Sequence, residues 1–319
     1  MGSLTPWVAA AAVSASVLLL ALRDAAPEAG HKRTATEDDA PTVVGSSSDE
    51  SSAEERPRYR WMQPPVVLET ETFDDIYDIE ADSVLGKGSF GTVVTARHRA
   101  SGRLVAVKRM NNLTSTERAA AINEYALQAR LQHPNIVRPV ACFAHGDSVQ
   151  LVLELASGGT LAAASLPLAE SNVREIATAL LQGLEHCHAA GIVHRDLKPT
   201  NVLLHRQGDF RSAQLADFGL AEKTRGRRVP LTDRSGTEEF MAPEVQRRER
   251  YGTAVDIYSL GVLLHVLATG QSLGEDRRPA FSARLSAEFQ AFVASMLEAD
   301  ARKRPTASAL LAHPCLARH

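Results

Sequence analysis

The chain has 319 residues, of which 44% are hydrophobic, and a formal net charge of −3 at pH 7. This size and composition allow one domain with a sizeable core, and the slightly acidic balance excludes the basic footprint of a nucleic-acid-binding protein. The cysteines lack metal-ligand spacing and are too few for a disulfide framework, which predicts core or surface thiols in a reducing compartment. They are Cys142, Cys187 and Cys315.

The first segment, residues 1–23, contains an apolar run over residues 7–22. Its length lies between the core of a signal peptide and a full membrane span. No Lys or Arg precedes the run, whereas Arg23 follows it, so the chain after it is expected on the cytoplasmic side. Three alternatives stay open for this segment: a membrane anchor, a cleaved targeting peptide and a soluble tail.

Residues 24–72 are polar and acidic, with a cluster of serines beside Asp49 and Glu50 at the centre. Low hydrophobicity combined with clustered charge predicts a disordered acidic, Ser-rich linker. We therefore expect the folded part of the chain to begin at Phe73.

From Phe73 to about Leu155, short β-branched runs alternate with turns, which predicts strands. Thr114 and Glu117 have the spacing of a capping box, which predicts one helix that starts there and runs to about Leu131. Farther along, residues 171–190 form an amphipathic helical stretch and residues 255–269 an apolar one. The pattern predicts a small β-rich lobe followed by a larger helical lobe.

Six short motifs occur in one order along these elements. They are a Gly-rich segment at residues 86–91, a Val-Ala-Val-Lys run ending at Lys108, Glu124, a His-Arg-Asp-Leu-Lys-Pro-Thr-Asn run at 194–201, Asp-Phe-Gly at 217–219 and Ala-Pro-Glu at 242–244. Glycines let backbone N–H groups approach phosphates, and a lysine on a buried strand is costly unless it is paired. Each motif alone is a modest signal, but all six in order are a specific one.

Together the motifs resemble the signature set of eukaryotic protein kinases of the serine/threonine type. The resemblance covers residues 73–316 and implies a bilobal α+β kinase fold, with an N-lobe at about 73–156 and a C-lobe at about 157–316. It implies a monomeric, cytoplasmic kinase domain that uses ATP and Mg²⁺ to phosphorylate Ser or Thr of protein substrates. A pseudokinase scaffold is the alternative, and the presence of Lys108, Asp196 and Asp217 argues against it.

The resemblance also implies a role for each site residue. Asp196 would accept the proton of the substrate hydroxyl, Lys198 would neutralise charge on the phosphoryl group, and Lys108 would hold the ATP phosphates. Asn201 and Asp217 would ligate Mg²⁺. The implied nucleotide-binding residues are Leu85, Gly86, Lys87, Gly88, Ser89, Phe90, Gly91, Val93, Ala106, Lys108, Glu124, Glu154, Ala156, Asn201 and Asp217.

Further residues are implied to support this centre. Thr237 would contact Asp196 and Lys198, and Asp256 would anchor the backbone of the loop at 194–201. Glu244 and Arg304 would form a buried ion pair.

Asp233 occupies a position that is often phosphorylated in relatives, so its carboxylate is a candidate substitute for phosphate, with a plain loop residue as the alternative. Thr224, Thr232 and Ser235 are candidate phosphorylation sites on the same segment, where Arg195 is the candidate partner for a phosphate.

Three features depart from common kinase patterns. Gln128 stands where an apolar residue normally completes a stack, so a looser active arrangement is expected. The region between Gly270 and Leu285 is short, which puts substrate docking in doubt. Thr160 and Thr200 are neutral where kinases that prefer basic peptides often carry glutamate, so no strong requirement for upstream arginine is expected.

Overall fold

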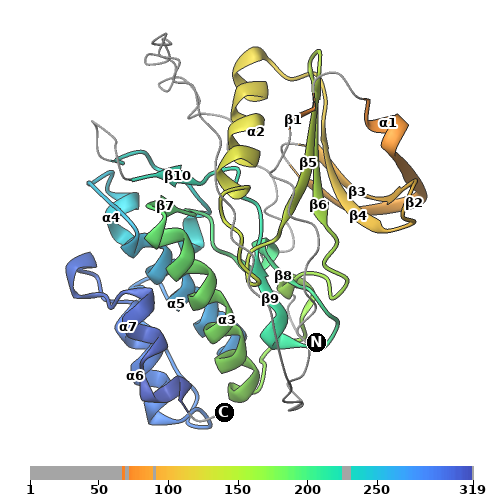
Figure 1. Ribbon diagram of the computed structural model, residues 1–319. Helices are drawn as coiled ribbons and strands as arrows, with labels where there is room; N and C mark the ends of the chain where they lie inside the picture. Colours follow the sequence, from red (N-terminus) through yellow and green to blue (C-terminus); the bar gives the residue numbers. More distant parts are fainter. Residues whose placement is uncertain (1–66, 69–71, 89–90, 225–230, 318–319) are drawn as a thin grey trace, which may run out of the picture.

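The computed structural model describes residues 67–68, 72–88, 91–224 and 231–317 (Figure 1). The apolar run at residues 7–22 and most of the predicted linker lie outside these residues, so both stay predictions from the sequence. Across the part of the chain that the structure describes, the helices are all too short or too polar to span a bilayer.

The first lobe is built on a six-stranded sheet with the order β1-β5-β6-β4-β3-β2. Strand β4 alternates its side chains between the core and the outer face, so that Val105 and Val107 are buried and Leu104 is exposed. Strand β5 lies deeper in the lobe, and most of its residues are buried. A short helix, α1, precedes β2. The strands and this helix are β1 (Val67–Leu68), α1 (Phe73–Ile76), β2 (Tyr77–Gly88), β3 (Gly91–His98), β4 (Leu104–Met110), β5 (Pro139–His145) and β6 (Ser148–Glu154).

Strand β1 lies inside the segment that was predicted to be a disordered linker. It pairs in parallel with β5, Val67 opposite Cys142 and Leu68 opposite Phe143, and Leu68 packs against the core of this lobe. The folded part therefore begins before the predicted boundary at Phe73. A two-residue strand is too short to show a periodic pattern in the sequence.

Helix α2 (Ser115–Gln128) begins at the predicted capping box. The Thr114 hydroxyl accepts a hydrogen bond from the Glu117 backbone N–H at 3.3 Å, and the Glu117 carboxylate accepts one from the Thr114 N–H at 2.9 Å. The helix ends somewhat earlier than the predicted Leu131, because the chain turns there and the Leu131 N–H bonds to the carbonyl of Gln128.

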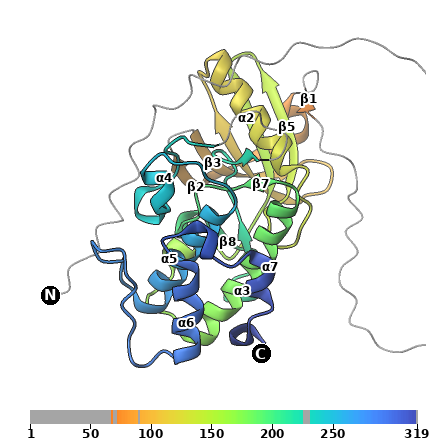
Figure 2. The ribbon, with the colours of Figure 1, turned by 90° about the vertical axis from the view of Figure 1, so that its left-hand side faces the viewer.

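The second lobe is mostly helical and lies below the sheet, as Figures 1 and 2 show. Two small two-stranded sheets, β7 with β10 and β8 with β9, lie on its side toward the six-stranded sheet. This arrangement confirms the predicted bilobal α+β fold. The elements are α3 (Glu170–Ala189), β7 (Ile192–Val193), β8 (Val202–Leu204), β9 (Ala213–Leu215), β10 (Glu222–Lys223), α4 (Pro243–Gln246), α5 (Ala254–Thr269), α6 (Ala287–Met296) and α7 (Ala307–Leu311).

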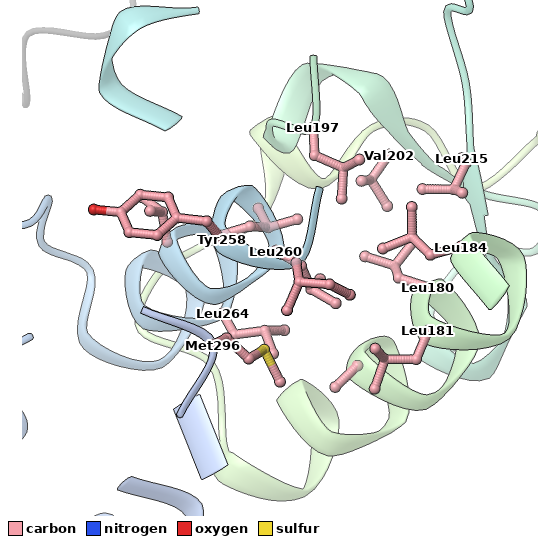
Figure 3. Close-up of a cluster of buried hydrophobic side chains, with 14 of the residues drawn as sticks. Leu180, Leu181, Leu184, Leu197, Val202, Leu215, Tyr258, Leu260, Leu264 and Met296 are labelled. Carbon is pink, nitrogen blue, oxygen red and sulfur yellow. The ribbon is translucent and has the colours of Figure 1, made fainter. Parts of the chain in front are cut away.

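Helix α5 forms the centre of the helical lobe. It is apolar on all sides, and its residues from Val255 to Ala268 are buried, as expected for a helix surrounded by others. Replacing one such buried leucine with alanine would cost about 2–5 kcal/mol. Its side chains pack with those of α3 and of the loop before β8, which gives that loop a rigid floor. Figure 3 labels Leu180, Leu181, Leu184, Leu197, Val202, Leu215, Leu260 and Leu264 among them.

Candidate active site

Lys108 connects the two lobes through an ion-pair cluster. Its Nζ donates to Glu124 of α2 at 2.8 and 3.1 Å and to Asp217, beyond β9, at 3.1 Å. Burial alone would lower the pKa of Lys108, but the two carboxylates outweigh it and raise the pKa, so the ammonium stays charged. Burial also opposes ionisation of Asp217, yet Lys108 holds the pKa of Asp217 below its usual value. The pairing of Lys108 with Glu124, which the resemblance to kinases implies, is present.

The loop at residues 194–201 is anchored by Asp256 of α5, which is fully buried. Its carboxylate accepts hydrogen bonds from the backbone N–H groups of His194 and Arg195, each at 2.9 Å, and contacts His188 Nε2 at 2.9 Å. Burial alone would raise the pKa of Asp256, but these polar neighbours outweigh it and lower the pKa. Arg195 has a φ of 70°, a conformation rare for residues other than glycine, and these bonds stabilise it.

Asp196 is the centre of a network within this loop. Its Oδ1 accepts hydrogen bonds from the Thr237 backbone N–H at 3.0 Å and from the Thr237 hydroxyl at 2.7 Å. Its Oδ2 lies 2.7 Å from Lys198 Nζ and accepts from Asn201 Nδ2 at 2.9 Å. Lys198 also donates to the Thr237 hydroxyl at 2.8 Å. The contacts of Thr237 with Asp196 and Lys198 are therefore present as predicted, and the structure adds the bond from Asn201 to Asp196.

Gly236 permits the close approach between this loop and Thr237. Its φ is 111°, and a Cβ at this position would lie 2.4 Å from the backbone oxygen of Arg195. No side chain fits there without moving one of the two backbones, so glycine is required for Thr237 to reach Asp196.

Asn201 and Asp217 offer oxygen atoms suited to a hard divalent cation. The Asn201 Nδ2 donates to both the backbone oxygen and Oδ2 of Asp196 at 2.9 Å. Its amide oxygen accepts a long hydrogen bond from the Thr200 hydroxyl at 3.4 Å and has a second lone pair that could bind a metal. The Ala216 N–H donates to the Asn201 backbone oxygen at 2.9 Å, so Asn201 lies beside the residue that precedes Asp217. One carboxylate and one amide oxygen fit Mg²⁺, which completes its shell with water and substrate phosphates.

The Gly-rich segment forms the hairpin between β2 and β3. Gly86 pairs with Val93 and Gly88 with Gly91, while Ser89 and Phe90 lie outside the described residues. Gly91 has a φ of 140°, and a Cβ there would lie 2.0 Å from the Arg109 carbonyl oxygen, so the tight pairing with β4 requires glycine. The hairpin that the sequence predicts is therefore present.

The other residues assigned to nucleotide binding lie on adjacent strands. Val93 pairs with Lys108, and Ala106 pairs with Leu153 across β4 and β6. The Glu154 N–H donates a hydrogen bond to the Arg138 carbonyl at 2.9 Å, and the Ala156 carbonyl accepts one from the Gly159 N–H at 3.4 Å. Leu85 and Lys87 are exposed near the end of β2. Contacts of these residues with a nucleotide stay predictions from the sequence.

The predicted buried ion pair of Glu244 with Arg304 is present, and one further buried contact supports the loop. Arg304 donates to both carboxylate oxygens of Glu244, at 2.6 and 2.8 Å, and its side chain is fully buried. Phe218 is fully buried and its ring packs against His194 with a centroid distance of 4.8 Å.

Asp233, the candidate substitute for phosphate, lies beside the candidate arginine, because Arg195 Nη1 donates to its carboxylate at 2.8 Å. Two further partners were not predicted. The Tyr251 hydroxyl accepts a hydrogen bond from Arg195 Nη1 at 3.1 Å and donates one to Asp233 at 2.9 Å. Gln128 is buried, and its Nε2 donates to the Val137 carbonyl at 2.7 Å, so this polar side chain has a partner in the place of the apolar stack. Neither Tyr251 nor the Val137 carbonyl has a sequence signal that would have identified it.

Comparison with known proteins places these features in one family. The protein kinase domain family matches residues 79–316. Serine/threonine-protein kinase SMU1 of Mycosarcoma maydis is 30% identical over 308 residues, which are 88% of this chain and 41% of the relative. Serine/threonine-protein kinase shk1/pak1 of Schizosaccharomyces pombe is 32% identical over 73% of this chain and 37% of the relative. Serine/threonine-protein kinase H1 of Homo sapiens is 35% identical over 63% of this chain and 48% of the relative.

The chain thus spans less than half the length of each of these relatives. The family match nevertheless runs through both lobes and includes all six motifs that the sequence analysis identified. The chain belongs to the protein kinase family.

Proposed function

We propose that this protein is a serine/threonine kinase, which transfers the γ-phosphoryl group of ATP to Ser or Thr hydroxyls of protein substrates. The observation that carries the proposal is the network in which Asp196, Lys198 and Thr237 bond to one another. The lysine in this loop and the threonine before Ala-Pro-Glu are features of the serine/threonine type, and the similar proteins named above are serine/threonine kinases.

The reaction follows from the placement of these groups. A substrate hydroxyl held at the Asp196 carboxylate attacks the γ-phosphorus, forming an O–P bond while the bond to the ADP oxygen breaks. The hydroxyl proton passes to Asp196, and the Lys198 ammonium offsets negative charge on the phosphoryl group in transit. Because Asp256 fixes the loop backbone, these groups are held in place before substrate arrives.

The nucleotide is held from the side of the sheet. The charged Lys108 would contact the ATP phosphates while Glu124 keeps it in position, and glycines 86, 88 and 91 would bring backbone N–H groups close to the phosphates. Asn201 and Asp217 would hold Mg²⁺, which when bound neutralises phosphate charge. The remaining nucleotide contacts are assigned as the sequence predicts, including Glu154 and Ala156.

The intact centre favours an enzyme over an ATP-binding scaffold. Lys108, Asp196 and Asp217 are all present, and Lys108 forms the ion pair with Glu124 that phosphoryl transfer by a kinase requires. We place the domain in the cytoplasm, where ATP is abundant, and as a monomer. Membrane association through residues 7–22 stays a prediction from the sequence.

A radiolabel-transfer assay tests the proposal. The full chain would be incubated with Mg²⁺, γ-labelled ATP and a generic protein substrate, beside Asp196→Asn and the control Asp147→Asn, which alters an exposed turn between β5 and β6. We expect label on Ser or Thr with the parent and the control, and a loss of at least about a hundredfold with Asp196→Asn. Transfer by Asp196→Asn at the parent rate, or label on tyrosine, would contradict the proposal.

A further inference from the structure

The segment between α5 and α6 carries an arginine in an unusual position. In residues 270–286, all of which the structure describes, the chain forms turns and extended stretches in place of a helix. Arg277 lies near the middle of this segment with a φ of 55°, in the left-handed region that an arginine rarely adopts. A residue kept in such a conformation needs other contacts that stabilise it.

Those contacts lead to the neighbourhood of the active site. Arg277 Nη2 donates to the backbone carbonyls of Met241 at 2.7 Å and Glu239 at 3.2 Å. Its Nε donates to the Tyr258 hydroxyl at 3.0 Å. A planar guanidinium with fixed N–H directions can hold two carbonyls and a hydroxyl at once, which a lysine ammonium on a flexible stem does less well.

The two carbonyls belong to the segment that meets the proposed acceptor site. Thr237, which bonds to Asp196 and Lys198, precedes Glu239 by two residues and Met241 by four. A protein substrate whose hydroxyl lies at Asp196 must place its neighbouring residues along this segment. The positions of Glu239 and Met241 therefore affect how the substrate is received.

Two more contacts hold the segment between α5 and α6, one near each of its ends. The Ser272 hydroxyl donates to the Glu239 carboxylate, and the ring of His265 on α5 contacts the Ala280 carbonyl at 3.1 Å. Residues 271–280 are thus fixed to α5 on one side and to residues 239–241 on the other. We call residues 271–280 the strap.

Tyr258 links the strap to the buried ion pair. The Arg277 guanidinium carbon lies 5.4 Å from the centroid of the Tyr258 ring and that of Arg304 lies 4.9 Å from it. Figure 3 shows the Tyr258 hydroxyl extending away from the leucine cluster of the core. Because Arg277 is only half-buried, its removal would free the carbonyls to bond with water, and the core would stay folded.

We propose that the strap positions the protein-substrate segment, residues 237–241, and that Arg277 is its positioning residue. The inference rests on the proposed kinase function. Typical relatives have a further helix in this region, and the strap would take over its part in substrate docking here. We expect the effect to be specific to the protein substrate, because Arg277 bonds to Glu239, Met241 and Tyr258, whereas Lys108 bonds to Glu124 and Asp217 in the nucleotide site.

Steady-state kinetics with the full chain test this role. The variants are Arg277→Ala, Arg277→Lys and the control Arg278→Ala, which removes an exposed neighbouring arginine. We expect Arg277→Ala to lower kcat/KM for the protein substrate by about tenfold, since it loses charge-assisted hydrogen bonds to two carbonyls. The KM for ATP and the melting temperature should match those of Arg278→Ala, and Arg277→Lys should restore only part of the loss.

Amide hydrogen exchange gives a second readout that needs no turnover. Amides of residues 236–242 should exchange faster in Arg277→Ala than in Arg278→Ala, whereas amides of α5 should not change. Parent-like kcat/KM together with parent-like exchange in Arg277→Ala would overturn the strap proposal. An inactive parent and control would contradict the proposed function, and the exchange data would still decide whether the strap exists.

Discussion

The contact between Arg195 and Asp233 gives a direct test of how the activation segment is held. The Arg195 side chain is 9% exposed, and its guanidinium donates to the Leu220 carbonyl at 2.6 Å, to Asp233 at 2.8 Å and to the Tyr251 hydroxyl at 3.1 Å. Asp233 is the only carboxylate among these three partners. Burial opposes the charge of Arg195, but Tyr251 and Asp233 outweigh it and raise the pKa.

Asp233→Asn removes the charge and keeps the shape. A hydrogen bond to a charged group is worth about 1.5–3 kcal/mol, and an asparagine retains part of it as a neutral bond. A loss of about 1.4 kcal/mol in the active arrangement corresponds to about tenfold in kcat/KM. We therefore expect Asp233→Asn to lose about tenfold, whereas Asp147→Asn should match the parent.

The assay uses full-length protein treated with phosphatase, so that Thr224, Thr232 and Ser235 carry no phosphate. The parent should remain active, because its carboxylate already occupies the position beside Arg195. Equal kcat/KM for Asp233→Asn and the parent would refute the reasoning. So would a parent that is active only after another kinase has phosphorylated it.

Three further outcomes follow from buried groups. Arg304→Met should lower the free energy of unfolding by about 3–5 kcal/mol in chemical denaturation, because it leaves the Glu244 charge buried and unpaired. The double variant Arg304→Met/Glu244→Gln should lose less stability, and an equal loss in the single and double variants would contradict this. Asp256→Asn should be less stable than the parent at pH 7. Because the pKa of Asp256 is lowered in the folded state, the stability difference between the parent and Asp256→Asn should persist above about pH 4 and shrink as the pH falls below that value. Thermal unfolding of both proteins at a series of pH values measures this difference. A thiol reagent should label the native protein negligibly and should label every cysteine after denaturation. The reason is that burial raises the pKa of Cys142 to about 12 and that of Cys315 to about 11, and it also raises the pKa of Cys187.

The sequence was most informative where a motif has internal spacing. Asp196, Lys198 and Asn201 lie within one loop, so their order along the chain already places them close together. A lysine on a buried strand needs a partner, and the resemblance to kinases implied that this partner is Glu124 on the helix that the capping box begins. The resemblance to kinases added the long-range contacts of Asp256 and of Glu244 with Arg304.

The remaining contacts have no such signal. Arg277 and Gln128 both donate to backbone carbonyls, which every residue carries, so no partner residue marks the bond in the sequence. The role of Tyr251 depends on how the chain after α4 returns toward Arg195. The short region after Gly270 was recognised as a departure, but its contact with Met241 became visible only in three dimensions.

The two-residue strand β1 has a consequence for how the protein behaves in solution. Without Val67 and Leu68, the backbone groups of β5 opposite them would lie at an uncovered edge of the sheet. Uncovered edge strands recruit strands from other molecules and promote aggregation. A truncated protein that starts at Phe73 would therefore be expected to self-associate, whereas one that keeps residues 67–72 would stay dispersed.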